Sequence, residues 1–265
     1  MSVILPPYVG RTVLVTGGAR RIGREICLRL AKEGFSIAVH YQTSESEARS
    51  LVEEIESIGQ KAISIQSDLS VPGSAQVLIS RCLDSIGPIS GLVNNASLFL
   101  HDDIETVDEA SWDSHMAVNA RAQTMLIRIF SEQFFQIRNS KPAQGSVVNV
   151  LDQKVASPNP DHLSYTASRF AMLGMTEALA RALAPRIRVN AVAPGHTLPS
   201  PEQSESGFRK AQSQSPLGYG PAASDIADSV SFLMNARAIT GQILFVDSGE
   251  RFLGRQRDVL FETEE

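Results

Sequence analysis

Short apolar runs alternate along this chain with longer segments in which apolar residues recur every three or four positions. The short runs have the length and composition of buried β-strands, and the longer ones have the period of amphipathic helices. We predict strands at 12–16, 36–41, 62–66, 91–94, 146–151, 187–192 and 243–246. We predict helices at 21–33, 45–58, 74–86, 107–138, 162–184 and 222–235. This alternation indicates βαβ units, and therefore an α/β fold with a parallel sheet covered by helices on both faces.

No Gly- or Ser-rich linker, composition change or internal repeat divides the chain, so residues 1–265 are predicted to form one domain. The segment 196–221 is polar, rich in Pro and Ser, and follows the sixth predicted strand. Loops at the carboxyl ends of parallel strands bind ligands, so we expect this segment to contact a substrate. The tail 250–265 carries apolar residues beyond the last strand, and we expect it to dock on this subunit or a neighbouring one and to close the site.

Composition disfavours several classes of partner. The net charge is −5 without any block of like charge, which argues against nucleic acid or a membrane surface. Cys27 and Cys82 are isolated, with no His at metal-ligand spacing, so neither a disulfide scaffold nor a metal site is expected. No apolar run reaches the length of a membrane span, and residues 1–10 lack the features of a signal peptide. We therefore expect a cytoplasmic protein that acts on a small molecule.

The first predicted strand leads into a glycine-containing turn, TGGARRIG at 16–23, that opens the first helix. Gly17 and Gly23 would let the backbone approach a phosphate group, and the helix beyond offers unpaired N–H groups. Arg20 and Arg21 add positive charge where the helix dipole disfavours it, which an anionic ligand explains better than a solvated helix start. A strand, a glycine turn and a helix in this order predict a dinucleotide site.

The end of the second predicted strand bears on the choice of nucleotide. Proteins that bind NAD usually place an acidic residue there to bind the ribose 2′-hydroxyl. The stretch HYQTS at 40–44 has no acidic residue, so a 2′-phosphate would meet no carboxylate and NADPH is favoured over NADH. After the third strand, Asp68 could accept a hydrogen bond from adenine or could cap the following helix.

An acid, a phenol and a cation are placed to meet beyond the fifth predicted strand. Asp152 follows the apolar run 146–151, and Tyr165 and Arg169 lie four residues apart, hence on one face of the next helix. The three side chains could converge on one pocket. Alternatively, Tyr165 and Arg169 could be helix-surface residues, and Asp152 could be a loop residue that caps the turn.

Together these motifs resemble the short-chain dehydrogenase/reductase family, and the likeness covers nearly the whole chain. The residues that carry it are TGGARRIG at 16–23, Asp68, NNAS at 94–97, Asn119, Tyr165, the pair Pro194–Gly195, and ITGQ to VDSG at 239–249. The resemblance implies a seven-stranded parallel Rossmann sheet and reversible hydride transfer between a nicotinamide and a carbonyl, alcohol or imine. It also implies long helices that pair across subunits, and so a homodimer or homotetramer.

The resemblance implies residue roles as well. Tyr165 would be catalytic, Asn119 would hold a proton-relay water through its backbone carbonyl, and Arg169, at the position of the family's Lys, would bind the nicotinamide ribose. The stretch Asn94–Ala96 would line the adenosine ribose of the cofactor. The cofactor-binding residues that we expect are Gly17, Arg20, Arg21, Ile22, Gly23, His40, Tyr41, Ser44, Asp68, Leu69, Asn95, Ala96, Tyr165, Arg169, Pro194, Gly195 and Thr197.

Departures from the family pattern narrow the activity. Where the family has a catalytic Ser this chain has Asp152, and where it has a Lys this chain has Arg169. Asp152, Arg21 in place of the second glycine, and Ser97 in NNAS resemble the pteridine reductase branch, which includes dihydromonapterin and dihydrofolate reductases. A carboxyl group partnered with a phenol can relay a proton to the ring nitrogen of a C=N bond.

We therefore predict an NADPH-dependent reductase of a pteridine-type C=N substrate, with Asp152, Tyr165, Arg169 and Asn119 as its catalytic residues. One alternative is a carbonyl or 3-oxoacyl reductase of the same family, which the missing Ser disfavours. Another is a catalytically silent NADPH-binding protein, because Arg is bulkier than Lys, planar and never deprotonated. Phe99 is a candidate to stack on a flat substrate ring.

Overall fold

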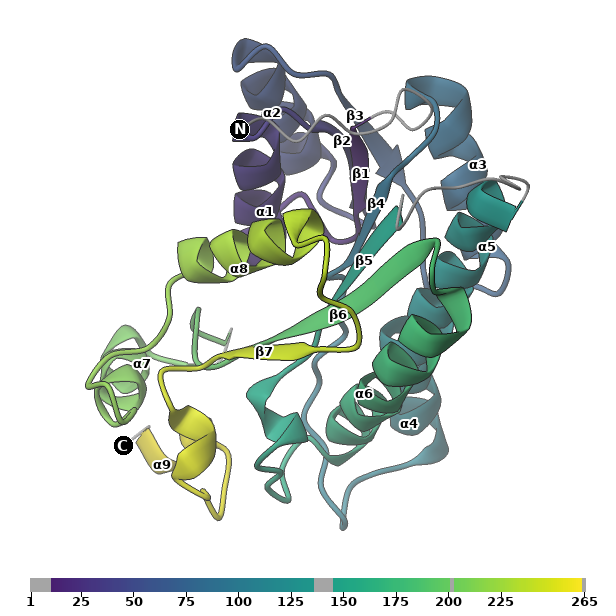
Figure 1. Ribbon diagram of the computed structural model, residues 1–265. Coiled ribbons are helices and arrows are strands. Elements are labelled where there is room, and N and C mark those ends of the chain that lie inside the picture. Colours follow the sequence, from purple (N-terminus) through teal and green to yellow (C-terminus); the bar gives the residue numbers. More distant parts are fainter. Residues whose placement is uncertain (1–10, 136–144, 201–202, 264–265) are drawn as a thin grey trace.

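The computed structural model describes residues 11–135, 145–200 and 203–263. All seven predicted strands are present and form one parallel sheet in the order β3-β2-β1-β4-β5-β6-β7 (Figure 1). Their bounds are β1 Thr12–Val15, β2 Ser36–Tyr41, β3 Ala62–Gln66, β4 Gly91–Asn94, β5 Gly145–Val150, β6 Ile187–Pro194 and β7 Ile243–Val246. The predicted seven-stranded parallel Rossmann sheet is confirmed.

Helices cover both faces of this sheet (Figure 1). On one face lie α1 (Arg21–Lys32), α2 (Glu45–Ser57) and α8 (Ala223–Asn235). On the other lie α3 (Ser74–Ile86), α5 (Gln123–Phe135) and α6 (Leu163–Leu183). A separate cluster of buried apolar side chains joins the helices of each layer to the strands, so both faces of the sheet are sealed from water.

The long helix predicted at 107–138 consists of three parts. They are α4 (Glu109–Met116), a π-helical turn η1 (Ala117–Ala122), and α5. The predicted final residues 136–138 lie outside the described residues. Single π-helical turns inside longer helices are frequent at functional sites, and this one carries Asn119.

Two short helices were not predicted, namely α7 (Glu205–Ser213) and α9 (Val259–Thr263). Only Gly207 and Ala211 of α7 are buried, so the sequence shows no apolar stripe there, and α9 is too short to show a period. The 3₁₀ turns η2 (Gln153–Val155) and η3 (Glu250–Phe252) precede α6 and α9. Within the described ranges, no helix combines the length and apolarity that crossing a membrane requires.

The parallel register brings distant segments to one edge of the sheet. β1 pairs with β2 on one side and with β4 on the other, so the strand order reverses at β1. Ligands bind at such a reversal, beyond the carboxyl ends of the strands. Gly17, Asn95, Asp152 and Gly195 all follow the ends of strands there.

Candidate active site

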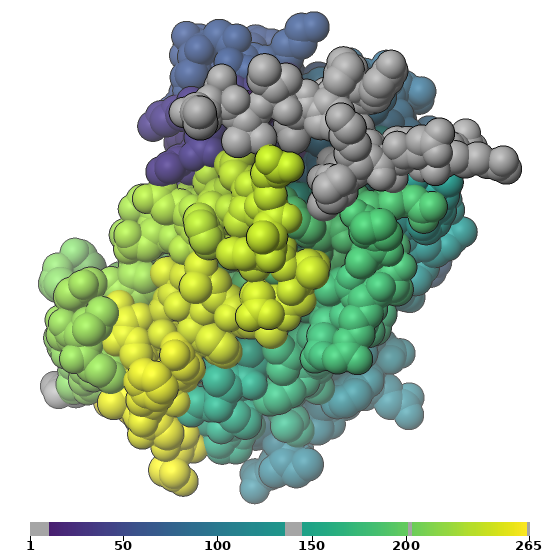
Figure 2. All heavy atoms as spheres, in the orientation of Figure 1, coloured from purple at the N-terminus to yellow at the C-terminus, as the bar shows by residue number. Residues whose placement is uncertain are grey.

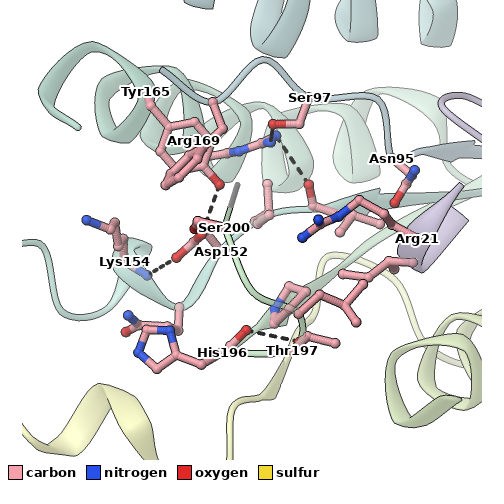
Figure 3. A pocket seen from close by; sticks show the side chains of 18 of the residues that line it. Arg21, Asn95, Ser97, Asp152, Lys154, Tyr165, Arg169, His196, Thr197 and Ser200 are labelled. Atoms are coloured by element: carbon pink, nitrogen blue, oxygen red, sulfur yellow. Dashed lines mark hydrogen bonds between the residues drawn. The ribbon is translucent and has the colours of Figure 1, made fainter. Parts of the chain in front are cut away.

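A cavity of about 600 Å³ lies at this edge of the sheet (Figure 3). The turn after β1, the segments after β4, β5 and β6, the start of α6 and the C-terminal end of the chain line it. This volume is within the range of small-molecule sites, roughly 300–1,000 Å³. The predicted site residues that line it are Gly17, Arg20, Arg21, Ile22, Gly23, Asn95, Ala96, Asp152, Tyr165, Arg169, Pro194, Gly195 and Thr197.

Tyr165 and Asp152 meet in this cavity (Figure 3). The Tyr165 hydroxyl donates a hydrogen bond of 2.9 Å to Asp152 Oδ2. The backbone N–H of Lys154 donates one of 2.8 Å to Asp152 Oδ1, at the start of η2. The carboxylate therefore caps the turn and contacts the phenol at the same time, so the two interpretations of Asp152 are compatible.

Burial is the largest influence on the Tyr165 phenol. The side chain is 5% exposed, and its burial raises the pKa of the phenol well above the usual value. The positive charge of Arg169 lowers this pKa, whereas the Asp152 carboxylate raises it further. The phenol is consequently neutral at physiological pH and suited to donate a proton.

Arg169 is buried beside Tyr165. It is 2% exposed, and its guanidinium donates hydrogen bonds to the Val150 carbonyl at 3.3 Å and to the Ser97 hydroxyl. Its Cζ lies 4.8 Å from the centroid of the Tyr165 ring, which is a cation–π contact. Its Nε has no hydrogen-bond partner among the described residues, so an acceptor such as a ribose hydroxyl would satisfy a costly buried donor.

The glycine turn after β1 allows close approach of a ligand. Gly17 has a φ of +60°, and a Cβ on Gly23 would lie 2.1 Å from the Gly17 carbonyl oxygen. No side chain of the described residues caps the N-terminus of α1, so its first N–H groups are available to an anion. With Arg20 and Arg21 on the cavity wall, this turn fits the diphosphate of a dinucleotide.

The His40 side chain has a structural role, and its predicted contact with the cofactor stays a prediction. It is 2% exposed and is not among the residues that line the cavity. Its Nδ1 accepts a hydrogen bond from the Gly17 N–H and its Nε2 donates one to the Ser67 carbonyl, both at 3.0 Å. Burial lowers the pKa of this imidazole to about 4, so the ring is neutral and holds the glycine turn in position.

The other residues expected around the adenosine also lie outside the cavity lining. Leu69 is 4% exposed and its side chain packs in the apolar core, and its contact with the cofactor stays a prediction. Asp68 Oδ1 accepts hydrogen bonds from the backbone N–H and the hydroxyl of Ser70, and its contact with adenine stays a prediction. The contacts expected of Tyr41 and Ser44 stay predictions too.

The two asparagines outside the cavity brace its walls. Asn94 is fully buried and donates a hydrogen bond of 2.9 Å to Asn149 Oδ1 in the neighbouring strand, so its side chain does not face the ligand. Asn119 Oδ1 accepts from the Leu98 N–H at 2.8 Å, and its Nδ2 donates to Ser168 Oγ at 3.1 Å. The relay role of the Asn119 carbonyl stays a prediction.

The segment after β6 lines the cavity, as expected of a substrate segment, with His196, Thr197, Leu198, Ser200 and Gln203. Arg21 Nη2 donates a hydrogen bond of 2.9 Å to the Pro199 carbonyl. Arg21 also has a φ of +52°, a region in which residues other than glycine are uncommon. The glycine turn and the substrate segment are therefore directly joined.

Phe99 lines the cavity at the position expected for a substrate contact. Its ring stacks on His162 with centroids 4.1 Å apart and meets the Tyr165 ring edge-on at 4.7 Å. Lining residues that sequence reasoning missed include Ser97, Gln153, Lys154 and Asp258. Ser97 could have been found from its place in the NNAS motif, whereas Lys154 and Asp258 carry no motif.

The chain matches known proteins of one family over most of its length. A family model described as short chain dehydrogenase matches residues 11–207. The 3-oxoacyl-[acyl-carrier-protein] reductase FabG of Staphylococcus aureus is 33% identical over 244 residues, which are 90% of this chain and 97% of that protein.

Solved structures resemble the chain over a similar extent. FolM alternative dihydrofolate reductase 1 from Brucella canis, complexed with NADP, is 40% identical with a TM-score of 0.86, covering 93% of this chain and 96% of that one. A short chain dehydrogenase from Burkholderia cenocepacia J2315 in complex with NADP is 30% identical with a TM-score of 0.82, covering 91% and 98%.

Proposed function

The chain belongs to the short chain dehydrogenase family, and from that premise we propose that it reduces a pteridine-type C=N bond with NADPH as the hydride donor. It is an oxidoreductase that binds NADP(H), and within the family it is FolM-like. The observation that carries the proposal is the hydrogen bond of 2.9 Å between Tyr165 and Asp152, a carboxylate where the family has a Ser hydroxyl.

Each residue of the site has a distinct task in this reaction. NADPH, when bound, supplies a hydride from C4 of its nicotinamide to the substrate carbon. Tyr165 donates its hydroxyl proton to the substrate nitrogen, so that a hydride and a proton add across the C=N bond. Asp152, hydrogen-bonded to the same hydroxyl, passes a solvent proton back to Tyr165. Arg169 orients the ribose but cannot pass a proton, because guanidinium is not deprotonated in proteins.

An unsatisfied acceptor also favours a substrate that carries N–H groups. Gln153 lines the cavity and is 8% exposed, and its Oε1 has no hydrogen-bond partner among the described residues. A buried acceptor without a partner costs free energy that a donor from the ligand would recover. Pteridine rings carry amino and ring N–H donors, whereas the reacting end of a 3-oxoacyl thioester carries only acceptors.

A 3-oxoacyl reductase is the second candidate, because the FabG relative is 33% identical over 90% of this chain. The absence of a Ser at 152 weighs against it, since a hydroxyl suits the polarisation of a carbonyl oxygen. A silent NADPH-binding protein is the third candidate, and it rests on Arg169 alone.

The test is NADPH oxidation with dihydrobiopterin, dihydromonapterin, dihydrofolate and an acetoacetyl thioester in parallel. We expect turnover with the pterin-type substrates and loss of about a hundredfold in kcat for Tyr165→Phe, in line with the size of general acid catalysis. Asp152→Ser should lower the ratio of pterin to thioester turnover, while an NADPH titration monitors the cofactor site in each variant. Thioester-only turnover, or NADPH binding without any turnover, would contradict the proposal.

We further propose that the chain assembles into a homodimer or homotetramer through α4, α5 and α6. Each of these helices leaves a large apolar side chain exposed, namely Trp112, Met125 and Phe170. Apolar side chains that gather on adjoining helices are typical of surfaces that bind a partner.

A further inference from the structure

The C-terminal segment, residues 250–263, forms one wall of the cavity. Asp258, Val259 and Leu260 line it together with Asp152 and Tyr165. Asp258 and Val259 are 8% and 3% exposed, so this wall is packed against the molecule. Figure 2 shows the segment, in yellow, beside the green segment that contains α7.

An ion pair joins this wall to the catalytic carboxylate. Lys154 Nζ lies 2.8 Å from Asp258 Oδ2, and both residues are buried. Burial alone would raise the pKa of Asp258, but the charge and hydrogen bond of Lys154 together with the Leu260 N–H outweigh it, so the pKa is lowered. The backbone N–H of the same Lys154 donates to Asp152 Oδ1 at 2.8 Å. Lys154 thus holds the C-terminal segment with its side chain and Asp152 with its backbone.

A second ion pair lies just before the helix that carries Tyr165. Arg257 binds Asp161 in a fork, with Nε 2.8 Å from Oδ2 and Nη2 2.7 Å from Oδ1. The backbone N–H of Asp258 donates to Asp161 Oδ2 at 2.6 Å. Asp161 is 1% exposed, so the fork closes over a desolvated carboxylate, a strong geometry for an Arg pair.

Aromatic contacts connect the segment to the other side of the site. The ring of Phe261 meets His101 edge-on at 5.1 Å, and His101 meets His162 at 5.1 Å. His162 in turn stacks on Phe99, which contacts Tyr165. The C-terminal segment therefore braces the residues before α6 and the segment after β4, which together enclose the substrate end of the cavity.

We propose that the Lys154–Asp258 ion pair positions the Asp152 carboxylate for the reaction. Asp258 is therefore a positioning residue that acts through Lys154, and Leu260 closes the pocket around a flat ring. This inference rests on the proposed function. A bicyclic ring can be enclosed by a fixed wall, whereas an acyl thioester must extend out of the pocket towards its carrier, so the wall favours the ring.

The test uses the full chain with Asp258→Asn, Lys154→Met, the double variant and Leu260→Ala. We expect Asp258→Asn and Lys154→Met each to lower kcat/KM for a dihydropterin about tenfold or more, since each leaves one buried charge unpaired. The double variant should lose less than the product of the two single losses, because both act through one pair. Leu260→Ala should raise kcat/KM for an acetoacetyl thioester relative to that for the dihydropterin.

A matched control is Glu177→Gln, which removes an exposed ion pair with Arg181 on α6. It should change kcat/KM neither for the dihydropterin nor for the thioester. NADPH affinity should stay the same in all variants, which a general loss of folding would not allow. The proposal is overturned if Asp258→Asn and Leu260→Ala leave both kcat/KM values within about twofold of the wild type.

The two proposals fail in different ways. If the wild type reduces only the thioester, the proposed function fails, whereas the positioning role of Asp258 fails only if Asp258→Asn also leaves thioester turnover unchanged. If the wild type binds NADPH and turns over nothing, both fail.

Discussion

Arg169 stands where the family has a Lys, so its contacts bear directly on the proposed activity. Its guanidinium reaches the Val150 carbonyl, the Ser97 hydroxyl and the Tyr165 ring at once. A Lys ammonium is a single point donor and cannot reproduce this planar set of contacts. These contacts favour the hypothesis that Arg169 is integrated into a working site over the hypothesis of a decayed one.

We therefore expect Arg169→Lys to lower kcat/KM about tenfold or more, the equivalent of one lost charged hydrogen bond. Steady-state kinetics with the best pterin substrate measures it. Arg181→Lys, on the exposed face of the same helix, is the matched control and should have no effect. A gain in turnover for Arg169→Lys would instead mean that the site has decayed from a Lys-containing ancestor.

Sequence reasoning at the residue scale succeeded where spacing decides geometry. Asp152 follows a buried strand and Tyr165 lies on the next helix, and the structure brings them to hydrogen-bond distance. It did not anticipate the structural bonds of His40, because a histidine at a strand end looks the same whether it faces a ligand or bonds to two backbone groups. It also could not pair Lys154 with Asp258, since nothing periodic relates charges so far apart along the chain.

At the scale of elements, the sheet was predictable and the short helices were not. Each strand coincides with a short apolar run, and the five central strands β2, β1, β4, β5 and β6 are largely buried, so their pattern is strong. α7 buries only two small residues and η2 spans one turn, so local contacts with the rest of the fold determine them. The cavity walls come largely from these weakly patterned pieces, which is why its lining was only partly foreseen.

His40, on β2, bonds to the segments that follow β1 and β3, and its burial makes the stability of the protein depend on pH. Its folded pKa is about 4 against 6.5 in the unfolded chain, so the unfolded state takes up a proton first as the pH falls. The stabilisation is fully present above pH 6.5 and is lost as the pH falls towards 4. Between pH 7 and 5 the loss is about 2 kcal/mol in the free energy of unfolding.

Urea denaturation of the wild type and of His40→Asn at both pH values measures this contribution. The variant should be less stable at pH 7, because the bond to the Ser67 carbonyl is lost, and its stability should depend less on pH. Equal pH dependence in the two proteins would show that another group is responsible. The buried His115 and His162 serve as internal references, since both remain in the variant and their pKa values are also lowered by burial.

At the scale of the whole molecule, the proposed assembly places α4, α5 and α6 against a second copy of the chain. The face formed by α4, α5 and α6 exposes Met125 at 39%, beside a hollow that Met116 and Met175 also line. Burying such a side chain in an interface contributes about 1.5–3 kcal/mol, and a charge there would cost more than it gains.

Sedimentation velocity of the wild type should therefore give a dimer or tetramer, and Met125→Glu should lower the mass. Ile58→Glu, an equally exposed apolar position at the end of α2, should not. A monomeric wild type would contradict the proposed assembly. An assembly that Met125→Glu leaves intact would show that the interface lies elsewhere, because the new charge would then lie in water at no cost.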